Sequence, residues 1–184
     1  TPTLEPPISF CDYASLALAD GMAFEGAINY WKKQLIQVPP PLDLPTDRPR
    51  PFVRTARSSS LVKRFDEALY QSLKRTAGQN RTTMVVLLMA ALKTLLFRLT
   101  GQTDLVVGLP VAGQAVTGQS CLVGHCVNLL PIRTHLCADS TFYENLMAVK
   151  RNVLDAYDHR QCTIGTILQH VHVSRSAGRQ PLIE

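Results

Sequence analysis

TMVVLLMAALKTLLFRLTGQTDLVVGLPV, residues 83–111, joins a long helical stretch to a short strand, and this pair decides the fold class. Thr82 or Thr83 can cap a helix that runs to about Leu99, because a side-chain hydroxyl can accept from the unpaired N–H groups of a first turn. Gly101 follows, and glycine readily adopts the left-handed conformation that ends helices. The stretch therefore predicts a helix, a glycine stop and a strand in succession.

The helix in this stretch is apolar on nearly all sides, which is typical of a helix buried in a core. We therefore expect Met84, Leu88 and Leu92 to pack inside the protein and not to line a cofactor site. The strand, DLVVGLPV at residues 104–111, is a continuous apolar run of the sort found in strands covered on both faces.

Two further elements are predicted before this helix. Asp66 can cap a helix that runs through Ala77 and is closed by Gly78. Residues 55–65 alternate and are rich in serine and β-branched residues, which predicts a strand. One side of that strand would carry Leu61, Lys63 and Phe65, and the other Val62 and Arg64.

The chain begins with two predicted helices and a proline-rich segment. Ser9 can cap the first helix, and Gly21 is expected to break it. The second helix carries Trp31 and Leu35 on its apolar side and must stop before the prolines. Residues 39–51 contain six prolines in thirteen positions, which predicts an extended strap across a surface.

The elements after the central pair complete an α/β pattern. Residues 123–135 predict a kinked strand, in which Pro131 favours an edge or a bulge. Thr141 can cap the next helix, with Glu144 at the spacing of a capping box, and a short helix is expected at 164–170. Alternating strands and helices of this kind predict a two-layer α/β sandwich.

Length and composition restrict the class of protein. A chain of 184 residues with 46% hydrophobic and 18% charged residues suits one globular domain and excludes a disordered or fibrous protein. No apolar run approaches the roughly 20 residues of a membrane span, and no signal peptide is visible. The basic residues behind the net charge of +5 are scattered without interleaved aromatic residues, so we expect no nucleic-acid partner and no membrane partner.

Cysteine usage and the two ends of the chain suggest its context. Five widely spaced cysteines among apolar neighbours are typical of reduced, buried thiols and predict a cytoplasmic location: Cys11, Cys121, Cys126, Cys137 and Cys162. The chain lacks an initiating methionine, and residues 180–184 are apolar and strand-like. We therefore expect it to be a piece of a longer protein.

General signatures of chemistry do not assign a reaction. The chain contains no GxxxxGK[ST], GxSxG or HExxH sequence. His170 and His172 lie on opposite sides of a helix, and the spacing of Cys121, His125 and Cys126 fits no common zinc pattern, so we expect no metal. The residues alone thus predict a soluble α/β domain without a stated activity.

Six ordered segments, however, resemble motifs of the condensation domain of nonribosomal peptide synthetases. FCDYA at 10–14 is similar to the family's (Y)xDYA, and YWKKQL at 30–35 with LPTDRP at 44–49 is similar to its YWxxxL…LPTDRP. VGLPVAG at 107–113 is similar to VGxPxAGR.

The other three segments follow in the family's order. LVGHCVNLLPIR at 122–133 resembles (I/V)GxFVNTxxxR, with His125 and Cys126 in place of bulky residues. HRQ at 159–161 with TIGTIL at 163–168 is similar to HQDxPFExL, without its acidic residues. SR at 174–175 with RQPL at 179–182 is similar to SRxPL.

The resemblance implies a fold and an activity. The family fold is a V of two chloramphenicol-acetyltransferase-like halves, and this chain resembles the C-terminal half, with a helical entry at 1–38, a proline-rich strap at 39–52 and an α/β core at 53–184. The complete domain would form an amide between an upstream carrier-bound acyl or peptidyl thioester and a downstream carrier-bound aminoacyl amine. The catalytic HHxxxDG motif is not in this chain and is expected upstream, so no catalytic residue is expected here.

The resemblance also implies partners and site residues. Expected partners are the N-terminal half, upstream and downstream carrier proteins and an adenylation domain; no cofactor is bound directly, because the substrates ride on the carriers' 4′-phosphopantetheine. Asn128 is the first candidate for a substrate contact, since an amide can bond an amine or a thioester carbonyl without titrating. The alternative for Asn128 is a buried amide that satisfies backbone groups. His125 and Gly124 complete the predicted substrate-binding segment.

Four other motif positions are expected to be structural: Asp12, Tyr13, Arg48 and Arg133. Arg133 is expected to pair with a carboxylate. Two alternative functions stay open. One is a catalytically silent half that binds carrier proteins through a basic run at Arg48, Arg50, Arg54, Arg57, Lys63 and Arg64. The other is a related epimerisation or heterocyclisation domain.

Overall fold

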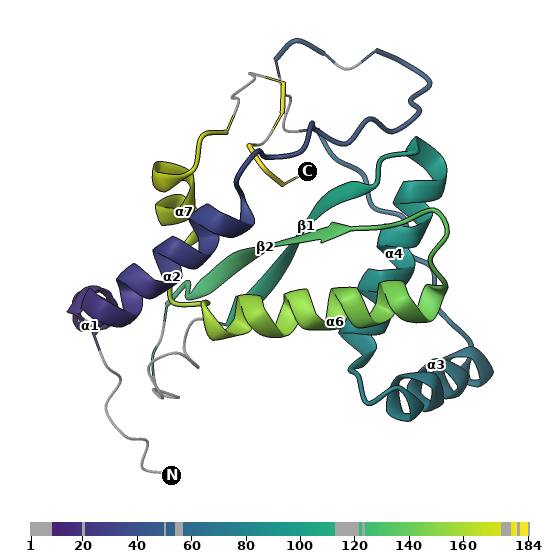
Figure 1. Cartoon of the computed structure of the whole chain (residues 1–184), viewed down its shortest axis with the longest axis horizontal. Helices are drawn as coiled ribbons and strands as arrows, with labels where there is room; N and C mark the ends of the chain where they lie inside the picture. Colours follow the sequence, from purple (N-terminus) through teal and green to yellow (C-terminus); the bar gives the residue numbers. More distant parts are fainter. Residues whose placement is uncertain are drawn as a thin grey trace. The chain divides into compact units, whose positions relative to one another are not determined.

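The computed structural model describes residues 9–19, 21–49, 51–53, 57–112, 122, 124–173, 178–179 and 181–183. Every helix predicted from the sequence is present, and the α/β class is confirmed (Figure 1). The elements are α1 (Phe10–Ala19), α2 (Gly21–Gln34), α3 (Glu67–Gln79), α4 (Met84–Thr100), β1 (Asp104–Ala112), β2 (Val127–His135), α6 (Phe142–Asp158) and α7 (Ile164–His170).

Internal contacts divide the chain into two compact units, which interleave along the sequence. Unit 1 comprises Thr1–Val38, Gly108–Ile132 and Asp155–Val173. Unit 2 comprises Pro39–Val107, Arg133–Leu154 and Ser174–Glu184. In unit 1, α2 packs beside α7, and in unit 2, α3 packs beside α4 (Figure 1). The division into a helical entry, a strap and a core stays a prediction.

Helix ends form where the sequence provides capping groups. Asp66 accepts a hydrogen bond from the Leu69 N–H at 2.8 Å, and Thr83 accepts one from the Val86 N–H at 3.3 Å. Gly101 ends α4 with a φ of 72°, a conformation that costs glycine nothing. Helix α3 continues one residue past Gly78, to Gln79, so the predicted glycine stop there was wrong by one residue.

The predicted capping box at the start of α6 is also present. The Glu144 carboxylate accepts from the Thr141 N–H at 2.7 Å, and the Thr141 hydroxyl accepts from the Glu144 N–H at 3.3 Å. The hydrogen bonds from Thr141 lower the pKa of Glu144 because they stabilise its charged form.

The strands β1 and β2 form a two-stranded sheet. The Leu136 N–H, just after β2, donates to the Thr103 carbonyl, just before β1, at 2.7 Å, so the strands run antiparallel. Pro131 lies within β2, and a two-stranded sheet has an outer edge on each strand where a missing N–H is tolerated. The strand begins at Val127 and not at 123 as predicted.

The predicted strand at 55–65 was wrong over the residues that the structure describes. Residues 57–66 form no helix or strand, and Leu61 and Val62 are 97% and 81% exposed. No described residue shares a backbone hydrogen bond with residues 57–65, and an alternating sequence becomes a strand only when a neighbour supplies the ladder. Residues 181–183 likewise form no strand.

Helix α4 is buried on one side only, contrary to the sequence prediction. Val86, Leu87 and Ala90 are buried, but Leu88 and Leu92 are 40% and 44% exposed. No single helix in the described part of the chain has the length and hydropathy of a membrane span; α3 and α4 reach them only together, and they are bent by 101° to each other.

Four of the five cysteines lie in the described part of the chain, and all four are free thiols. Cys126 and Cys162 are buried as predicted, and burial raises the pKa of Cys162 to about 11. Cys11 and Cys137 are exposed, so the prediction of burial was wrong for them. Cys121 lies outside the described residues.

Inside unit 2, a fully buried lysine on α4 joins the core by hydrogen bonds. The Lys93 ammonium donates to the Thr134 hydroxyl at 2.9 Å and to the Leu105 carbonyl at 3.2 Å. Asn152 of α6 donates to the same hydroxyl at 3.1 Å and to the Arg133 carbonyl at 2.6 Å. These bonds tie α4, both strands and α6 together through polar groups.

Burial makes this lysine sensitive to pH. It lowers the pKa of Lys93 from 10.5 to about 7, and the nearby Asp104 carboxylate opposes the shift only in part. Between these values the unfolded chain holds more protons than the folded one, so stability rises with pH across that window. We expect the free energy of unfolding to rise by about 2 kcal/mol from pH 7 to pH 9, and Lys93→Met to remove this rise. Urea denaturation of both proteins at pH 7 and at pH 9 measures the free energy of unfolding. An equal change between the two pH values in both proteins would contradict the prediction.

Candidate functional site

The side chain of Asn128 connects β2 to the segment that links α6 to α7. Its amide N–H groups donate to the carbonyls of Cys162 at 2.8 Å and Arg160 at 3.1 Å. Its carbonyl oxygen accepts from the N–H groups of Ile164 at 3.1 Å and Leu129 at 2.8 Å. An asparagine amide has two donor hydrogens and two acceptor positions, so all four are occupied by backbone groups. Asn128 therefore holds the turn that starts α7.

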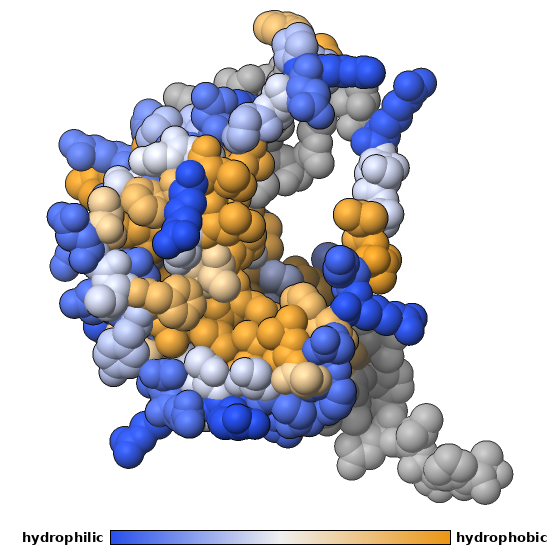
Figure 2. Space-filling view, turned by 90° about the vertical axis from the view of Figure 1, so that its right-hand side faces the viewer, coloured by the Kyte–Doolittle hydropathy of each residue, from blue (hydrophilic) through white to orange (hydrophobic). Residues whose placement is uncertain are grey.

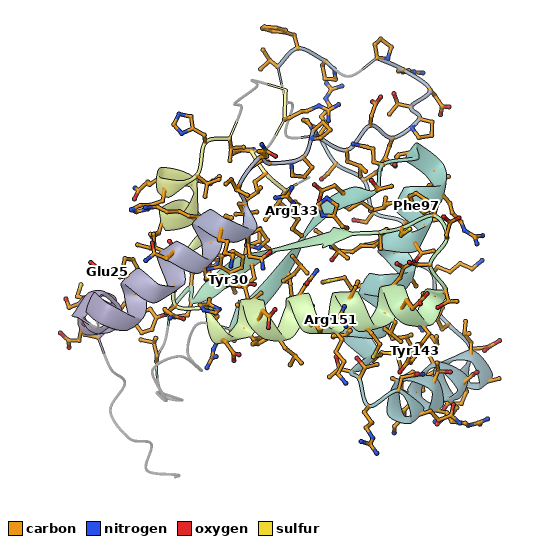
Figure 3. All side chains as sticks on the ribbon, viewed as in Figure 1. Glu25, Tyr30, Phe97, Arg133, Tyr143 and Arg151 are labelled. Atoms are coloured by element: carbon orange, nitrogen blue, oxygen red, sulfur yellow. The ribbon has the colours of Figure 1, made fainter. Side chains whose placement is uncertain are left out.

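An aromatic cluster holds the other end of the same linking segment. Tyr30 of α2, which is labelled in Figure 3, stacks on the imidazole of His159, with ring centroids 3.9 Å apart and planes 4° apart. The neighbouring Trp31 is 2% exposed, and its indole N–H donates to the His159 carbonyl at 3.0 Å. The YW motif and the HRQ motif, far apart in sequence, thus meet in space.

The ring of His159 is also anchored to α6. Its Nδ1 lies 2.7 Å from the Asp155 carbonyl oxygen, and a carbonyl can only accept, so Nδ1 carries a hydrogen. The pKa of Tyr30 is raised well above its ordinary value, chiefly by burial and also by the charges of Asp155 and Asp158. Tyr30 is therefore a neutral phenol at physiological pH.

The FCDYA and VGHCVN motifs also meet within unit 1. A Cβ atom at Gly124 would lie 2.6 Å from Cδ2 of Phe10, so only glycine leaves room for this ring in its present position. The rings of Phe10 and Tyr13 are 5.7 Å apart. Burial, with the charge of Cys126, raises the pKa of Tyr13. Helix α1 is thus packed against the segment that precedes β2.

The contact between Gly124 and Phe10 leads to a prediction. We expect Gly124→Ala to lower the free energy of unfolding by about 1 kcal/mol, because the added methyl group displaces the Phe10 ring. Phe10→Ala should make the same change at Gly124 nearly neutral, giving a coupling energy of about 1 kcal/mol in a double-mutant cycle. Denaturant titration of the four proteins measures it; purely additive effects would contradict the contact.

The predicted substrate-binding and structural residues divide between the two units. Unit 1 contains Gly124, His125, Asn128, Asp12 and Tyr13, of which Gly124, His125 and Asp12 are exposed. His125 has no hydrogen-bond partner among the described residues. These placements leave the substrate contacts of Gly124, His125 and Asn128 as predictions.

In unit 2, Arg133 of β2, which is labelled in Figure 3, pairs with Asp104 of β1. Its Nε lies 3.0 Å from Oδ1 and its Nη2 2.7 Å from Oδ2, and His135 lies 3.3 Å from the same carboxylate. Arg48 lies exposed in the strap, and it has no ion pair within the described part of the chain.

The strap itself is held by side chains of unit 2. Gln102 accepts from the Asp43 N–H at 2.9 Å and donates to the Pro41 carbonyl at 3.2 Å. Arg179 donates to the Leu42 carbonyl at 3.0 Å, so the SRxPL-like motif contacts the segment just before LPTDRP. The strap, which is itself part of unit 2, is thus held by hydrogen bonds within that unit.

Two features were not predicted from the sequence. They are the stacking of Tyr30 on His159 and the burial of Lys93. The motifs signalled Tyr30 and His159, but spacing alone could not bring them together. For Lys93 the available signal was a single charge in the middle of an apolar helix. Among the described residues, no group of three histidine, cysteine, aspartate or glutamate side chains could hold a metal ion.

Comparison with known proteins agrees with the resemblance that the motifs indicate. The family model of the condensation domain matches residues 1–184. A linear gramicidin synthase from Brevibacillus parabrevis is 34% identical over 187 residues, covering 100% of this chain and 2% of the relative. Phosphinothricin tripeptide synthetase of Streptomyces viridochromogenes is 32% identical over 185 residues, covering 100% of this chain and 16% of the relative.

Solved structures of similar fold include condensation-type domains. The X-domain from teicoplanin biosynthesis superposes with a TM-score of 0.86 at 26% identity, covering 99% of this chain and 42% of that one. A four-domain nonribosomal peptide synthetase bound to AMP and glycine gives a TM-score of 0.87 at 26% identity, covering 96% of this chain and 14% of that one. The chain therefore spans only a small part of its curated relatives.

The family model covers the whole chain, and within unit 1 the structure brings the HRQ motif into contact with the YW motif and with Asn128 of the VGHCVN motif. The chain belongs to the condensation-domain family of nonribosomal peptide synthetases.

Proposed function

We propose that this chain is the C-terminal half of a condensation domain that forms an amide bond. In the complete domain, the amine of an aminoacyl group on a downstream carrier attacks the acyl or peptidyl thioester on an upstream carrier. The new C–N bond forms, the C–S bond breaks, and the upstream phosphopantetheine leaves as a thiol. Holding both tethered substrates at one point makes the attack effectively unimolecular.

The observation that carries the proposal is the match of the family model over residues 1–184. In unit 1, moreover, four motif segments share one set of contacts around β2, the start of α7 and the N-terminal helices. We propose that exposed Gly124 and His125 face the substrates, and that Asn128 acts on them by positioning the turn at 160–164. The same proposal includes a cytoplasmic location. It also includes three kinds of partner, which are the N-terminal half of the domain, carrier proteins and an adenylation domain.

The test uses the parent synthetase segment that spans both carriers and the complete domain. The coding sequence upstream of Thr1 is read first, and an in-frame HHxxxDG motif is expected. Each carrier is then loaded by its own adenylation domain from a mixture of proteinogenic amino acids. Mass spectrometry of the intact downstream carrier should detect an added aminoacyl residue, and replacing the second histidine of HHxxxDG should abolish it. A DxxxxD pattern in place of HHxxxDG would instead favour heterocyclisation.

A second candidate function, a binding half without chemistry, has a specific observation in its favour. The X-domain from teicoplanin biosynthesis, 28% identical with a TM-score of 0.87, has been solved as a complex with OxyB. In this chain Arg48, Arg57, Lys63 and Arg64 are exposed, and Arg50 and Arg54 lie outside the described residues. Exposed basic side chains suit an acidic carrier protein or the phosphate of its phosphopantetheine.

Titration of a holo carrier protein into the complete domain at about 50 mM and about 500 mM salt tests this binding, because screening weakens contacts between exposed charges. We expect Lys63→Ser with Arg64→Ser to weaken binding at low salt, and Lys74→Ser, a matched exposed position on α3, to leave it unchanged. Binding that is absent, or insensitive to salt, would contradict the candidate. Carrier binding without amide formation would favour it over the enzyme.

A further inference from the structure

The proline-rich strap has little bonding of its own. Residues 39–49 and 51–53 lie in no helix or strand, and every hydrogen bond that the structure gives to them comes from the side chain of Gln102 or Arg179. Six prolines remove N–H groups that internal hydrogen bonds would need. The strap is mostly exposed, and the top of Figure 2, at the height of the strap in Figure 1, is mostly hydrophilic. The conformation of the strap therefore depends on a few contacts from outside it.

The two ends of the strap meet at neighbouring residues. Arg179 donates to the Leu42 carbonyl at 3.0 Å. A Cβ atom at Gly178 would lie 3.0 Å from the carbonyl oxygen of Pro51 and 3.2 Å from that of Phe52, so the backbone there passes very close to the strap. Because neighbouring Cα atoms are about 3.8 Å apart, Gly178 and Arg179 together close the strap into a loop. The clasp is the name used below for the three residues that hold the strap: Gln102, Gly178 and Arg179.

The segment that follows the clasp contains a strained turn. The Ile183 N–H donates to the Pro181 carbonyl at 2.9 Å, which closes a three-residue turn around Leu182. The φ of Leu182 is 72°, a left-handed value at which a side chain crowds the backbone. Such a conformation persists only where the surrounding structure holds it. Ile183 is 9% exposed, and the burial of its side chain stabilises the turn.

The clasp and the strained turn are linked through the chain, since Leu182 lies three residues after Arg179. We propose that the clasp and this turn open and close together, as one conformational device of unit 2. In the closed state, which the structure shows, Arg179 is bonded to Leu42 and Ile183 is buried. In the open state these contacts are lost, the ends of the strap separate and Leu182 leaves its strained conformation.

The coupling lets a contact at one segment control the other. A partner that binds the strap only in its open state also shifts residues 181–183, and a partner that binds those residues in one state shifts the strap. The inference goes beyond the proposed activity, because opening requires neither carrier proteins nor amide formation.

A thiol at position 183 tests whether the strap and the turn open together. Ile183→Cys is made in the complete domain, alone and with Gln102→Ala, which removes side-chain hydrogen bonds at the strap. Peptide-resolved mass spectrometry follows labelling by a maleimide. We expect Gln102→Ala to speed up labelling at position 183 by at least about fivefold, because a weaker clasp opens more often. Gln71→Ala, which removes a hydrogen bond within α3 of the same unit, should leave the rate unchanged.

Native cysteines provide internal controls for this labelling. Cys11 is exposed and reports the reactivity of the maleimide, and buried Cys162 reports wider unfolding. Neither rate should change in Gln102→Ala. An unchanged rate at position 183, an equal acceleration by Gln71→Ala or an equal acceleration at Cys162 would overturn the proposal.

A comparison of two residues at position 182 tests the strain without the added thiol. Leu182→Gly and Leu182→Ala both remove the leucine side chain beyond Cβ, but only glycine adopts a φ of 72° without strain. The reporter is the N–H of Asp43, which is bonded to Gln102 in the closed strap. We expect its hydrogen exchange, measured by mass spectrometry, to be at least about threefold slower in Leu182→Gly than in Leu182→Ala. At an unstrained position glycine is the more flexible residue and the order is reversed. Equal rates or the reversed order would overturn the proposal.

Discussion

Trp31→Ala is expected to lower the free energy of unfolding by about 3 to 5 kcal/mol, the largest effect of any single change proposed for this chain. The indole is 2% exposed, so its removal leaves a cavity in unit 1. The change also removes the N–H donor to the His159 carbonyl and the edge-on contact with Tyr30, whose ring centroid is 4.9 Å away. Because Trp31 is the only tryptophan, unfolding is followed by far-UV circular dichroism in urea.

Two matched variants separate the causes. Trp31→Phe keeps an aromatic ring but loses the donor, and it should cost about half as much as Trp31→Ala. Tyr143→Ala removes an aromatic residue that is 57% exposed and should change stability by less than about 0.5 kcal/mol. A Trp31→Ala protein as stable as Tyr143→Ala would contradict the packing of α2 in unit 1.

Asn128→Ala is expected to cost about 3 to 4 kcal/mol, because one truncation removes four hydrogen bonds. It leaves the carbonyls of Arg160 and Cys162 and the N–H of Ile164 without this partner. Hydrogen exchange should speed up first at the start of α7, where the Asn128 oxygen accepts from Ile164.

Asn128→Asp provides the sharper comparison at this position. Aspartate keeps the acceptor for Leu129 and Ile164 but places a negative oxygen against the carbonyls of Arg160 and Cys162, so we expect it to be at least as destabilising as alanine. If Asn128 only positions the turn, the rate of amide formation by the complete domain should fall together with the protection of the start of α7 against hydrogen exchange. Loss of activity in either variant with unchanged protection would instead indicate direct contact with substrate.

Elements that depend on local chemistry could be predicted from the sequence. The caps at Asp66 and Thr83, the left-handed Gly101 and the Thr141–Glu144 box each involve groups within a few residues of one another. Such interactions depend on residue spacing alone, so the helix ends at these caps were predicted to within about one residue. The end of α2 at Gln34 has no such cap and was predicted only to lie before Pro39.

Elements that depend on a distant partner could not be predicted. Residues 57–65 have the alternation of a strand, but no described segment supplies their hydrogen bonds. Leu88 and Leu92 have the composition of a core, but composition does not say which faces of an apolar helix are covered. In both cases the residue pattern favours burial or strand pairing. Whether these residues are buried or paired depends on a neighbouring segment of the folded chain.

The same distinction applies to the site. The motif resemblance identified Asn128, yet the four backbone groups that occupy its amide lie one residue away and 32 to 36 residues away in sequence. The stack of Tyr30 on His159 joins residues that no spacing rule relates. The motifs therefore pointed to Asn128, Tyr30 and His159, but only the folded structure shows which groups these residues contact.

The close approach of Gly124 to Phe10 has a consequence for how related sequences change over time. The space that a Cβ atom would need at position 124 is filled by the ring at position 10, so the two positions share one volume. A lineage that acquires a larger residue at 124 should therefore carry a smaller one at 10, and the order of the two changes should favour the smaller residue first. In a large set of relatives, these two positions of different motifs should covary as a pair.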